Sequence, residues 1–453
     1  MKLFAAKKNR QQRRQLDPIR ITALGFAVMI LLGALLLLLP AANKDGTTVP
    51  FVNALFTATS ATCVTGLIVY DTYTQFTLFG QAVILTLIQI GGLGFMTVGS
   101  LLMLVTRRRI GLAGRNLLTE SVSAFQIGGI VRLIRRIIIG TVIAETIGAA
   151  LLAIRFCPLL GVKTGIYYAF FHAISAFCNA GFDIMGRFAP YTSLTPFQGD
   201  VIVNLTVAAL IVIGGIGFVV WDDLREHKLR WRKYRLHTKI VITVTLSLII
   251  GGAIAFYLLE RTRTLSGLPA GQQILAAIFQ SVSPRTAGFN TVEMGELSEG
   301  GSALTMLLMF IGASPGSTGG GLKTTTLMTI IMTTVAYIRG TSDVNIFRRR
   351  LPFDTVRRAF SFTAIYLALV IFGVFALTAA QPLPLKDVTF EVFSALGTVG
   401  LSTGITRELG TFSRIIITLL MYIGRVGSLT LIFAVLRSDN AGLRNPEEKI
   451  IIG

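Results

Sequence analysis

Apolar stretches of two lengths alternate along the 453-residue chain. The long stretches, of which 19–39 is the first, reach the roughly 20 residues that a helix needs to cross a bilayer. The short stretches, of which 51–61 is the first, are too short to cross and run into loops rich in small and hydroxyl residues. The order long, short, loop, long occurs in four consecutive units. This pattern predicts four repeats, each built from a span, a re-entrant helix, a loop and a second span.

The predicted elements follow from these stretches. The first spans lie near 19–39, 136–154, 239–259 and 359–380. The re-entrant helices lie near 51–61, 166–177, 272–282 and 388–396. The second spans lie near 75–106, 196–221, 302–338 and 412–436. The predicted fold class is an all-α integral membrane protein with eight transmembrane helices in four pseudo-symmetric repeats, each carrying a re-entrant pore loop.

No separate soluble domain fits into the remaining chain. The predicted organisation is an N-terminal arm (1–17), repeat 1 (18–115), repeat 2 (116–236), repeat 3 (237–350), repeat 4 (351–437) and a C-terminal tail (438–453). The basic start and the apolar run after it resemble a signal peptide. However, 19–39 is longer than the apolar region of a signal peptide, which favours a retained first helix.

Each short stretch carries Phe and Ser four positions apart, followed by a loop that ends on one Gly. The four motifs are Phe56–Ser60–Gly66, Phe171–Ser175–Gly181, Phe279–Ser283–Gly288 and Phe390–Ser394–Gly400. Spacing by four places Phe and Ser on one face of a short helix. The glycines follow one another in steps of 115, 107 and 112 residues, and the third loop is one residue shorter than the others.

The four loops predict a pore lined by backbone carbonyls. Non-helical backbone at membrane depth is tolerated where protein buries it or where it lines a water-filled cavity. Glycine permits the backbone angles that aim carbonyls at one axis, and carbonyl rings replace the hydration shell of a monovalent cation. We expect a dominant cation site at the level of the four glycines; four helix-capping glycines without an ion are the structural alternative. The candidate selectivity-filter residues are Thr62, Cys63, Val64, Thr65, Gly66, Phe177, Cys178, Asn179, Ala180, Gly181, Arg285, Thr286, Ala287, Gly288, Gly397, Thr398, Val399 and Gly400.

Each second span contains Ile-Gly, which predicts close helix packing or a kink. These pairs are Ile90-Gly91, Ile213-Gly214, Ile311-Gly312 and Ile423-Gly424. The third span, 302–338, is too long for one crossing, so we expect it to break at mid-membrane. Its glycine-rich centre superficially resembles a phosphate-binding loop, but Leu322 separates the last Gly from Lys323, so nucleotide binding at this site is rejected.

The break provides a candidate gate. Its residues are Gly312, Ala313, Ser314, Pro315, Gly316, Ser317, Thr318, Gly319, Gly320, Gly321 and Lys323, to which we add Arg425 from the last span. A charge at membrane depth costs about 2.5–3.5 kcal/mol on insertion scales and therefore faces a cavity or a partner. A fixed cation below a filter opposes cation passage. The alternative is an arginine that hydrogen-bonds a broken helix end for structure alone.

Composition and charge agree with a membrane protein. Apolar residues make up 53% of the chain and charged residues 14%, with a net charge of +20. Most of the 42 Lys and Arg residues lie in 1–20, 107–136, 222–239, 339–358 and 437–453, which fall on one side when the spans are counted. The positive-inside bias makes this side and both termini cytoplasmic, so the four loops open outward. We expect no nucleic acid partner, although basic loops could also bind acidic lipid or protein.

These motifs together resemble the ion-translocating subunit of the bacterial Trk/Ktr/HKT potassium transporter superfamily over nearly the whole chain. The segment Gly397-Thr398-Val399-Gly400 is similar to a potassium-channel filter, and the direct entry of 19–39 into the first re-entrant helix is most similar to the Ktr branch. The resemblance implies a potassium-channel-like fold and K⁺ uptake across the bacterial inner membrane. In the superfamily, glycine at all four filter positions accompanies potassium selectivity, and this chain has Gly66 at the first.

The resemblance also implies partners and a gating mechanism. The superfamily forms homodimers in the lipid bilayer, each protomer with its own pore, on a cytosolic KtrA-like RCK regulatory ring. Nucleotide (ATP or ADP) would then act only through that partner. The segment 312–323 resembles the family's intramembrane gating loop, and Arg425 matches its pore arginine.

Other functions fit less well. A Na⁺-conducting or weakly selective relative is the alternative within transport, and Na⁺ dependence stays open. An enzyme is disfavoured by three histidines without a His-Glu-x-x-His motif and by the lack of paired intramembrane carboxylates. The three cysteines form no metal or disulfide framework. Glu145 predicts an interhelical bond or an ion-coupling role, and His172 a packed histidine with its hydrogen bonds satisfied.

Overall fold

Four long apolar helices begin the four repeats in the computed structural model, which describes residues 18–94, 130–228, 230–427 and 448. They are α2 (Pro18–Leu38), α8 (Ile130–Leu160), α12 (Leu236–Glu260) and α16 (Phe353–Ala380). Each is long and apolar enough to cross a membrane. The four predicted first spans are therefore confirmed, although α8 and α16 begin six residues earlier than expected. The predicted arm (1–17) and most of the predicted tail (438–453) lie outside the described residues.

A short helix follows each long one and packs against it. These re-entrant helices are α3 (Phe51–Thr62), α9 (Val162–Phe177), α13 (Ala270–Val282) and α17 (Leu385–Gly397). Proline at the N-cap of three of them, Pro50, Pro269 and Pro384, stops any helix from continuing backward into the loop. Their ends lie within a few residues of the predictions. The predicted Phe and Ser of every motif are buried.

The second spans are shorter or more broken than predicted. They are α5 (Leu78–Leu93), α10 (Val201–Gly215) with α11 (Phe218–His227), α14 (Glu299–Phe310) with α15 (Thr324–Ile338), and α18 (Thr411–Val426). The predicted break in 302–338 is present between α14 and α15. The prediction of a continuous span over 196–221 was wrong, because α10 and α11 meet at an angle of 94°. Gly217 makes this bend with φ +93°, a conformation that side chains rarely adopt. Residues 95–106 and 428–436 of the predicted first and fourth second spans lie outside the described residues.

The Ile-Gly pairs bring the second spans against the re-entrant helices. A Cβ placed on Gly91, Gly214 or Gly424 would lie only 2.0–2.1 Å from a backbone oxygen at the C-terminal end of a re-entrant helix. Those oxygens belong to Thr62, Phe177 and Leu396. Close packing, predicted from the small residues, is thus the role of three pairs. In repeat 3 Gly312 instead packs on Gly320 of its own loop.

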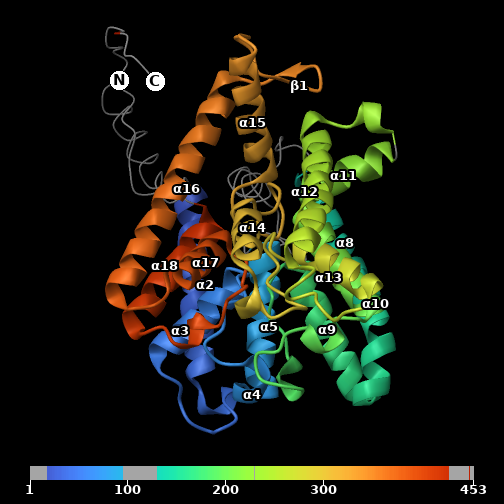
Figure 1. The fold of residues 1–453 in the computed structure, drawn as a ribbon. Coiled ribbons are helices and arrows are strands. Elements are labelled where there is room, and N and C mark those ends of the chain that lie inside the picture. The colour runs from blue at the N-terminus through green and yellow to red at the C-terminus, as the bar shows by residue number, and fades with distance from the viewer. Residues whose placement is uncertain (1–17, 95–129, 229, 428–447, 449–453) are drawn as a thin grey trace, which may run out of the picture.

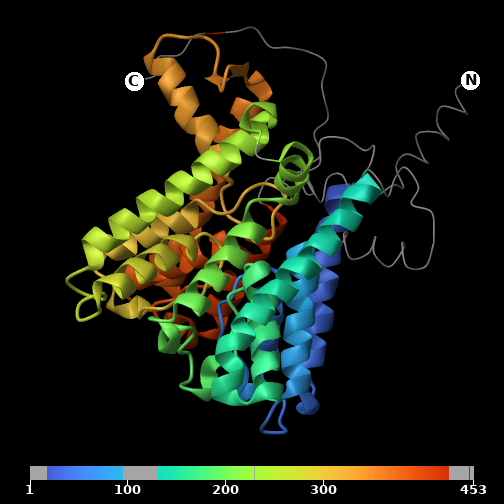
Figure 2. The same cartoon turned by 90° about the vertical axis from the view of Figure 1, so that its right-hand side faces the viewer.

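The two ends of the molecule differ in character (Figure 1). One end carries α4 (Thr72–Gln75) and the short helices η1 (Pro40–Ala42), η2 (Met185–Arg187), η3 (Thr195–Phe197), η5 (Met294–Glu296) and η6 (Ile405–Arg407). The other end carries α11, η4 (Trp231–Lys233) and an antiparallel hairpin of β1 (Asn345–Ile346) and β2 (Arg349–Arg350). In both views the hairpin lies at the end opposite the blue loop around α4 (Figures 1 and 2). The hairpin end is rich in exposed arginine and lysine.

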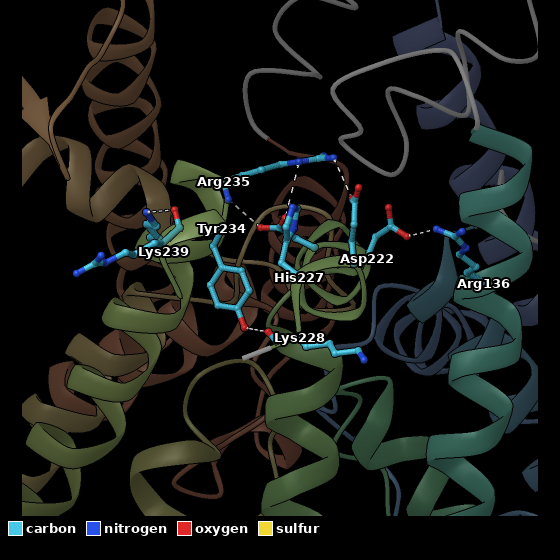
Figure 3. A network of polar contacts seen from close by, with 10 residues as sticks. Arg136, Asp222, His227, Lys228, Tyr234, Arg235 and Lys239 are labelled. Carbon is cyan, nitrogen blue, oxygen red and sulfur yellow. Dashed lines mark hydrogen bonds and ion pairs between the residues drawn. The ribbon is translucent and has the colours of Figure 1, made fainter. Parts of the chain in front are cut away.

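Charged contacts fix the turn between α11 and α12 at the hairpin end (Figure 3). The buried Asp223 carboxylate accepts the backbone N–H of Arg235 at 3.0 Å and contacts His227 Nδ1 at 3.0 Å. Next to it, Asp222 pairs with Arg136 of α8 at 2.5 Å. These contacts connect α11 to α8 and to Arg235, the N-cap of α12.

The outer surface of the bundle is apolar and its centre holds polar groups. Leu24, Ile143, Ile254 and Phe375 expose 53–70% of their surface on the four first spans. Thr59, Ser60, Ser283 and other hydroxyl residues are buried among the re-entrant helices. Lipid rather than water suits such a surface. The protein is therefore an all-α integral membrane protein of four similar units.

Candidate functional site

The four loop glycines form a closed ring. A Cβ built on Gly66 would lie 2.6 Å from the backbone oxygen of Ala180, and one on Gly181 would lie 2.6 Å from that of Ala287. The same construction on Gly288 meets the oxygen of Val399 at 2.4 Å, and on Gly400 that of Thr65 at 2.2 Å. Each glycine thus packs against the carbonyl oxygen that precedes the glycine of the next loop. Only a residue without a side chain fits at these four points.

Every loop contains two left-handed residues, spaced two apart. The first is Val64, Asn179, Thr286 or Thr398, with φ between +50° and +80°. The second is the ring glycine, with φ between +68° and +96°. Non-glycine residues adopt such angles rarely, and the strain they store is typical of functional sites. Alternating left-handed with ordinary residues turns successive carbonyls toward the same side of a strand, as a lining of oxygens requires.

A vestibule of about 150 Å³ lies directly outside the ring. All four glycines line it, together with polar residues from the loops that follow them. The charged lining groups are the carboxylates of Asp183 and Glu293 and the guanidinium of Arg407. Burial raises the pKa of Asp183, which lies outside the spanning helices, to about 7; the Met185 N–H opposes this and the nearby Asp71 adds to it. The vestibule therefore carries opposite charges at its wall.

Tyr191 and Ser193 of repeat 2, which line the vestibule, contact residues of the three other repeats. The Tyr191 N–H donates to Asp71 at 3.0 Å, and its hydroxyl donates to Val69 O at 3.2 Å, both in repeat 1. The Arg407 guanidinium of repeat 4 stacks 4.5 Å above the Tyr191 ring. Ser193 Oγ accepts the N–H of Asn290 from repeat 3 at 3.3 Å. Sequence reasoning missed this assembly, because it joins residues that are 97 or more positions apart in the chain.

The glycine-rich break of repeat 3 lies against the inner side of the ring loops. A Cβ on Gly319 would meet the Thr286 hydroxyl at 2.0 Å, and one on Gly320 would meet the Thr398 hydroxyl at 2.3 Å. The Ser314 N–H donates to Gly215 O at 3.0 Å, so the break also contacts the bend between α10 and α11. The structure therefore brings the candidate gate next to candidate filter residues of repeats 3 and 4.

Two cations hold this break by its carbonyls. Lys323 Nζ donates to Gly319 O at 2.7 Å and to Gly320 O at 3.0 Å. Arg425 donates to Thr318 O, and through its other terminal nitrogen to Gly91 O and, at 3.2 Å, to Gly92 O. The last two carbonyls belong to the C-terminal end of α5, where positive charge is favourable. Arg425 thus bonds a broken helix end and the candidate gate at once.

The remaining candidate filter residues lie behind the ring. Cys63 and Cys178 are buried directly after α3 and α9, and the side chain of Asn179 lies 3.1 Å from the Thr286 hydroxyl. Arg285 is buried, and its Nε has no hydrogen-bond partner among the described residues. Phe177 packs against Trp221 of α11. These side chains form the wall of the loops rather than their lining.

Two further groups singled out in the sequence have structural partners. Glu145 Oε1 of α8 accepts Gln89 Nε2 of α5 at 3.0 Å, which is the interhelical bond that was predicted as one alternative. His172 is packed as predicted, among the rings of Phe156, Phe171 and Tyr168. Its Nδ1 contacts Tyr168 O at 2.8 Å. The prediction that all hydrogen bonds of His172 are satisfied was wrong, since its Nε2 has no hydrogen-bond partner among the described residues.

Comparisons with known proteins identify relatives along the whole chain. The model of the TrkH family, described as cation transport protein, matches residues 1–441. Ktr system potassium uptake protein B of Bacillus subtilis (strain 168) is 41% identical over 438 residues, which cover 96% of this chain and 97% of that protein. Potassium/sodium uptake protein NtpJ of Enterococcus hirae is 39% identical over 449 residues, or 97% and 98% of the two chains.

A solved structure shares the fold. The crystal structure of the potassium transporter TrkH from Vibrio parahaemolyticus matches with a TM-score of 0.73, covering 93% of this chain and 85% of that one. The two sequences are 18% identical, so this likeness concerns the fold alone.

Proposed function

Because the chain belongs to the TrkH family of cation transport proteins, we propose that it takes up potassium through a pore at the centre of its four loops. The observation that carries the proposal is the ring, in which each of four glycines packs on a carbonyl of the next loop. The four ring glycines occupy equivalent backbone positions in the four repeats and contact one another's loops in a closed ring. The names of the two relatives, which contain potassium uptake and potassium/sodium uptake, favour this cation class.

The ring carbonyls supply the ion site. They belong to Thr65, Ala180, Ala287 and Val399, each one residue before a ring glycine. Carbonyl oxygens replace the water that a potassium ion loses on entry. The re-entrant helices aim their C-terminal ends, which carry partial negative charge, toward the same region. The carboxylates of Asp183 and Glu293 in the vestibule attract cations to the outer mouth.

The break of repeat 3 is the gate. It lies across the inner side of the filter loops, where it blocks the path of an ion that leaves the ring. Lys323 and Arg425 hold it closed through its carbonyls and add positive charge that opposes a cation. Opening requires that Arg425 release the carbonyl of Thr318.

The hairpin end faces the cytoplasm of a bacterial cell. Its exposed arginines and lysines satisfy the positive-inside bias. This end contacts a cytosolic KtrA-like RCK ring that binds ATP or ADP, and the functional unit is a homodimer with one pore in each protomer. The RCK ring acts on the pore through α15, which joins the basic hairpin to the gate.

Sodium is the second candidate. The name of the Enterococcus hirae relative includes sodium, which supports Na⁺ conduction or Na⁺-dependent uptake by this chain. Glycine rather than serine at position 66 favours potassium as the conducted ion. Sodium then serves as a coupling or regulatory ion.

Flux into liposomes tests the proposal. The full-length protein is reconstituted, and uptake of K⁺ and Na⁺ is measured from equal outside concentrations, with a protein-free control. We expect K⁺ uptake that exceeds Na⁺ uptake. Equal uptake of both ions contradicts potassium selection and favours the sodium-conducting alternative. Uptake of neither ion, by well-folded protein with the gate segment deleted, contradicts the pore.

A further inference from the structure

The four serines of the re-entrant helices use their hydroxyls in two different ways. All four occupy the same motif position and are buried: Ser60, Ser175, Ser283 and Ser394. The backbone oxygen of each accepts an N–H from its loop in the same manner, from Thr65, Ala180, Ala287 and Val399 at 2.8–2.9 Å. In loop 3, which is one residue shorter, the Ser283 backbone oxygen also accepts the N–H of Gly288 at 3.4 Å. Apart from this second bond, the four backbones cap their loops alike. Their side chains do not act alike.

In repeats 1 and 4 the hydroxyl holds the peptide that forms the ring. Ser60 Oγ accepts the N–H of Gly66 at 3.1 Å, and Ser394 Oγ accepts the N–H of Gly400 at 3.0 Å. In a trans peptide the N–H and the preceding C=O point in opposite directions. A hydroxyl that draws the Gly66 N–H into the wall therefore turns the carbonyl of Thr65 out of it. That oxygen is the one that packs on Gly400.

The same argument applies to Ser394. It draws the Gly400 N–H into the wall and turns the Val399 carbonyl toward Gly288, the next glycine in the ring. Rotation of either peptide would move a ring oxygen away from the axis. Because both hydroxyls are buried, no water replaces them as acceptors.

In repeats 2 and 3 the hydroxyl holds a different peptide. Ser175 Oγ donates to Phe182 O at 2.6 Å, and Ser283 Oγ donates to Phe289 O. Both phenylalanines follow the ring glycine, so these bonds fix the outer exit of the loop. The ring carbonyls of Ala180 and Ala287 receive no orienting bond from the serine side chains.

We propose that Ser60 and Ser394 are positioning residues for ion selection, whereas Ser175 and Ser283 support only the loop exits. The proposal rests on the proposed function, since it assigns the selection of K⁺ over Na⁺ to the ring. A ring selects potassium over the smaller sodium ion only while all four of its oxygens face the axis and together replace the hydration shell of potassium. If one peptide rotates its oxygen away from the axis, the ring loses part of that preference. Loss of the Ser60 or Ser394 hydroxyl therefore lowers discrimination at the ring.

Two pairs of matched variants test this proposal. Ser60→Ala and Ser394→Ala remove one oxygen each, and Ser175→Ala and Ser283→Ala remove the same atom from the same motif position. The full-length proteins are reconstituted, and the ratio of K⁺ to Na⁺ uptake is measured. We expect the ratio to fall about two- to tenfold in the first pair, the equivalent of one neutral hydrogen bond, and to stay at the wild-type value in the second.

The ratio separates positioning from folding, because less folded protein lowers both fluxes together. Ser60→Thr and Ser394→Thr keep the hydroxyl and are expected to restore the ratio. Two independent serines keep the test open if one variant does not fold. An unchanged ratio in Ser60→Ala and Ser394→Ala, or an equal fall in all four, overturns the proposal. A wild-type protein without K⁺ preference overturns the proposed function instead.

Discussion

Replacing Arg425 with alanine should open the pore. Its guanidinium bonds the gate at Thr318 O and the end of α5 at Gly91 O and Gly92 O, so it ties the gate to another repeat. A hydrogen bond to a charged group contributes about 1.5–3 kcal/mol, and the Thr318 bond is the one that holds the gate directly. Losing it shifts the closed-to-open equilibrium by about 10- to 150-fold. Removing the positive charge from the ion path acts in the same direction.

The assay is K⁺ uptake into liposomes at equal amounts of folded protein. Arg425→Lys keeps the charge but loses the fork that bridges two sites, so a smaller increase is expected. Arg414→Ala is the matched control on the same helix, since Arg414 bonds Asn53 Oδ1 at 2.8 Å and Arg407 O at 3.1 Å, neither of which belongs to the gate. Uptake by Arg425→Ala at or below the wild-type rate, with Arg414→Ala unchanged, would refute the account of the gate.

Three further predictions concern the ring, the vestibule and the bond between α5 and α8. Gly66→Ser should lower the K⁺ to Na⁺ uptake ratio, because its φ of +94° and the Ala180 oxygen leave no room for a Cβ; an unchanged ratio contradicts the dominant site. The Asp183 carboxyl becomes charged as pH rises through about 7, so K⁺ uptake at low K⁺ concentration should rise between about pH 6 and pH 8. Asp183→Asn should abolish that rise, and a rise that persists in this variant excludes Asp183 as its source. Glu145→Gln should keep the bond to Gln89 and leave K⁺ uptake unchanged, and a loss of uptake would restore the ion-coupling role.

The repeat order was predictable because the length of an apolar run is a local signal. The long apolar runs gave the first spans and the short runs gave the re-entrant helices. Pro50, Pro269 and Pro384, which precede three of these helices in the structure, are a further local signal that the prediction did not use. The recurring Gly gave the four positions that meet in the ring. The break in the second span of repeat 3 was predictable from length alone, because 302–338 is too long for one crossing and neither half of it reaches the thickness of a bilayer.

The bend in repeat 2 carries no comparable signal. Its glycines lie in an uninterrupted apolar run of normal length, and what favours the bend is a tertiary contact: Gly217 passes within reach of the Pro315 carbonyl of the gate. The vestibule was equally hard to predict, since Tyr191 and Ser193 together contact residues of the three other repeats. The serines share one motif, so their two hydroxyl roles depend on the local path of each loop.

An ion bound in the ring is the central claim, and anomalous scattering from crystals grown in Rb⁺ tests it most directly. We expect one dominant peak on the axis, coordinated by the carbonyls of Thr65, Ala180, Ala287 and Val399. The same crystals grown in Na⁺ and then exchanged into Rb⁺ should regain it. Well-ordered ring loops with no peak between these four oxygens, or with a dominant peak elsewhere in the protein, would contradict the account.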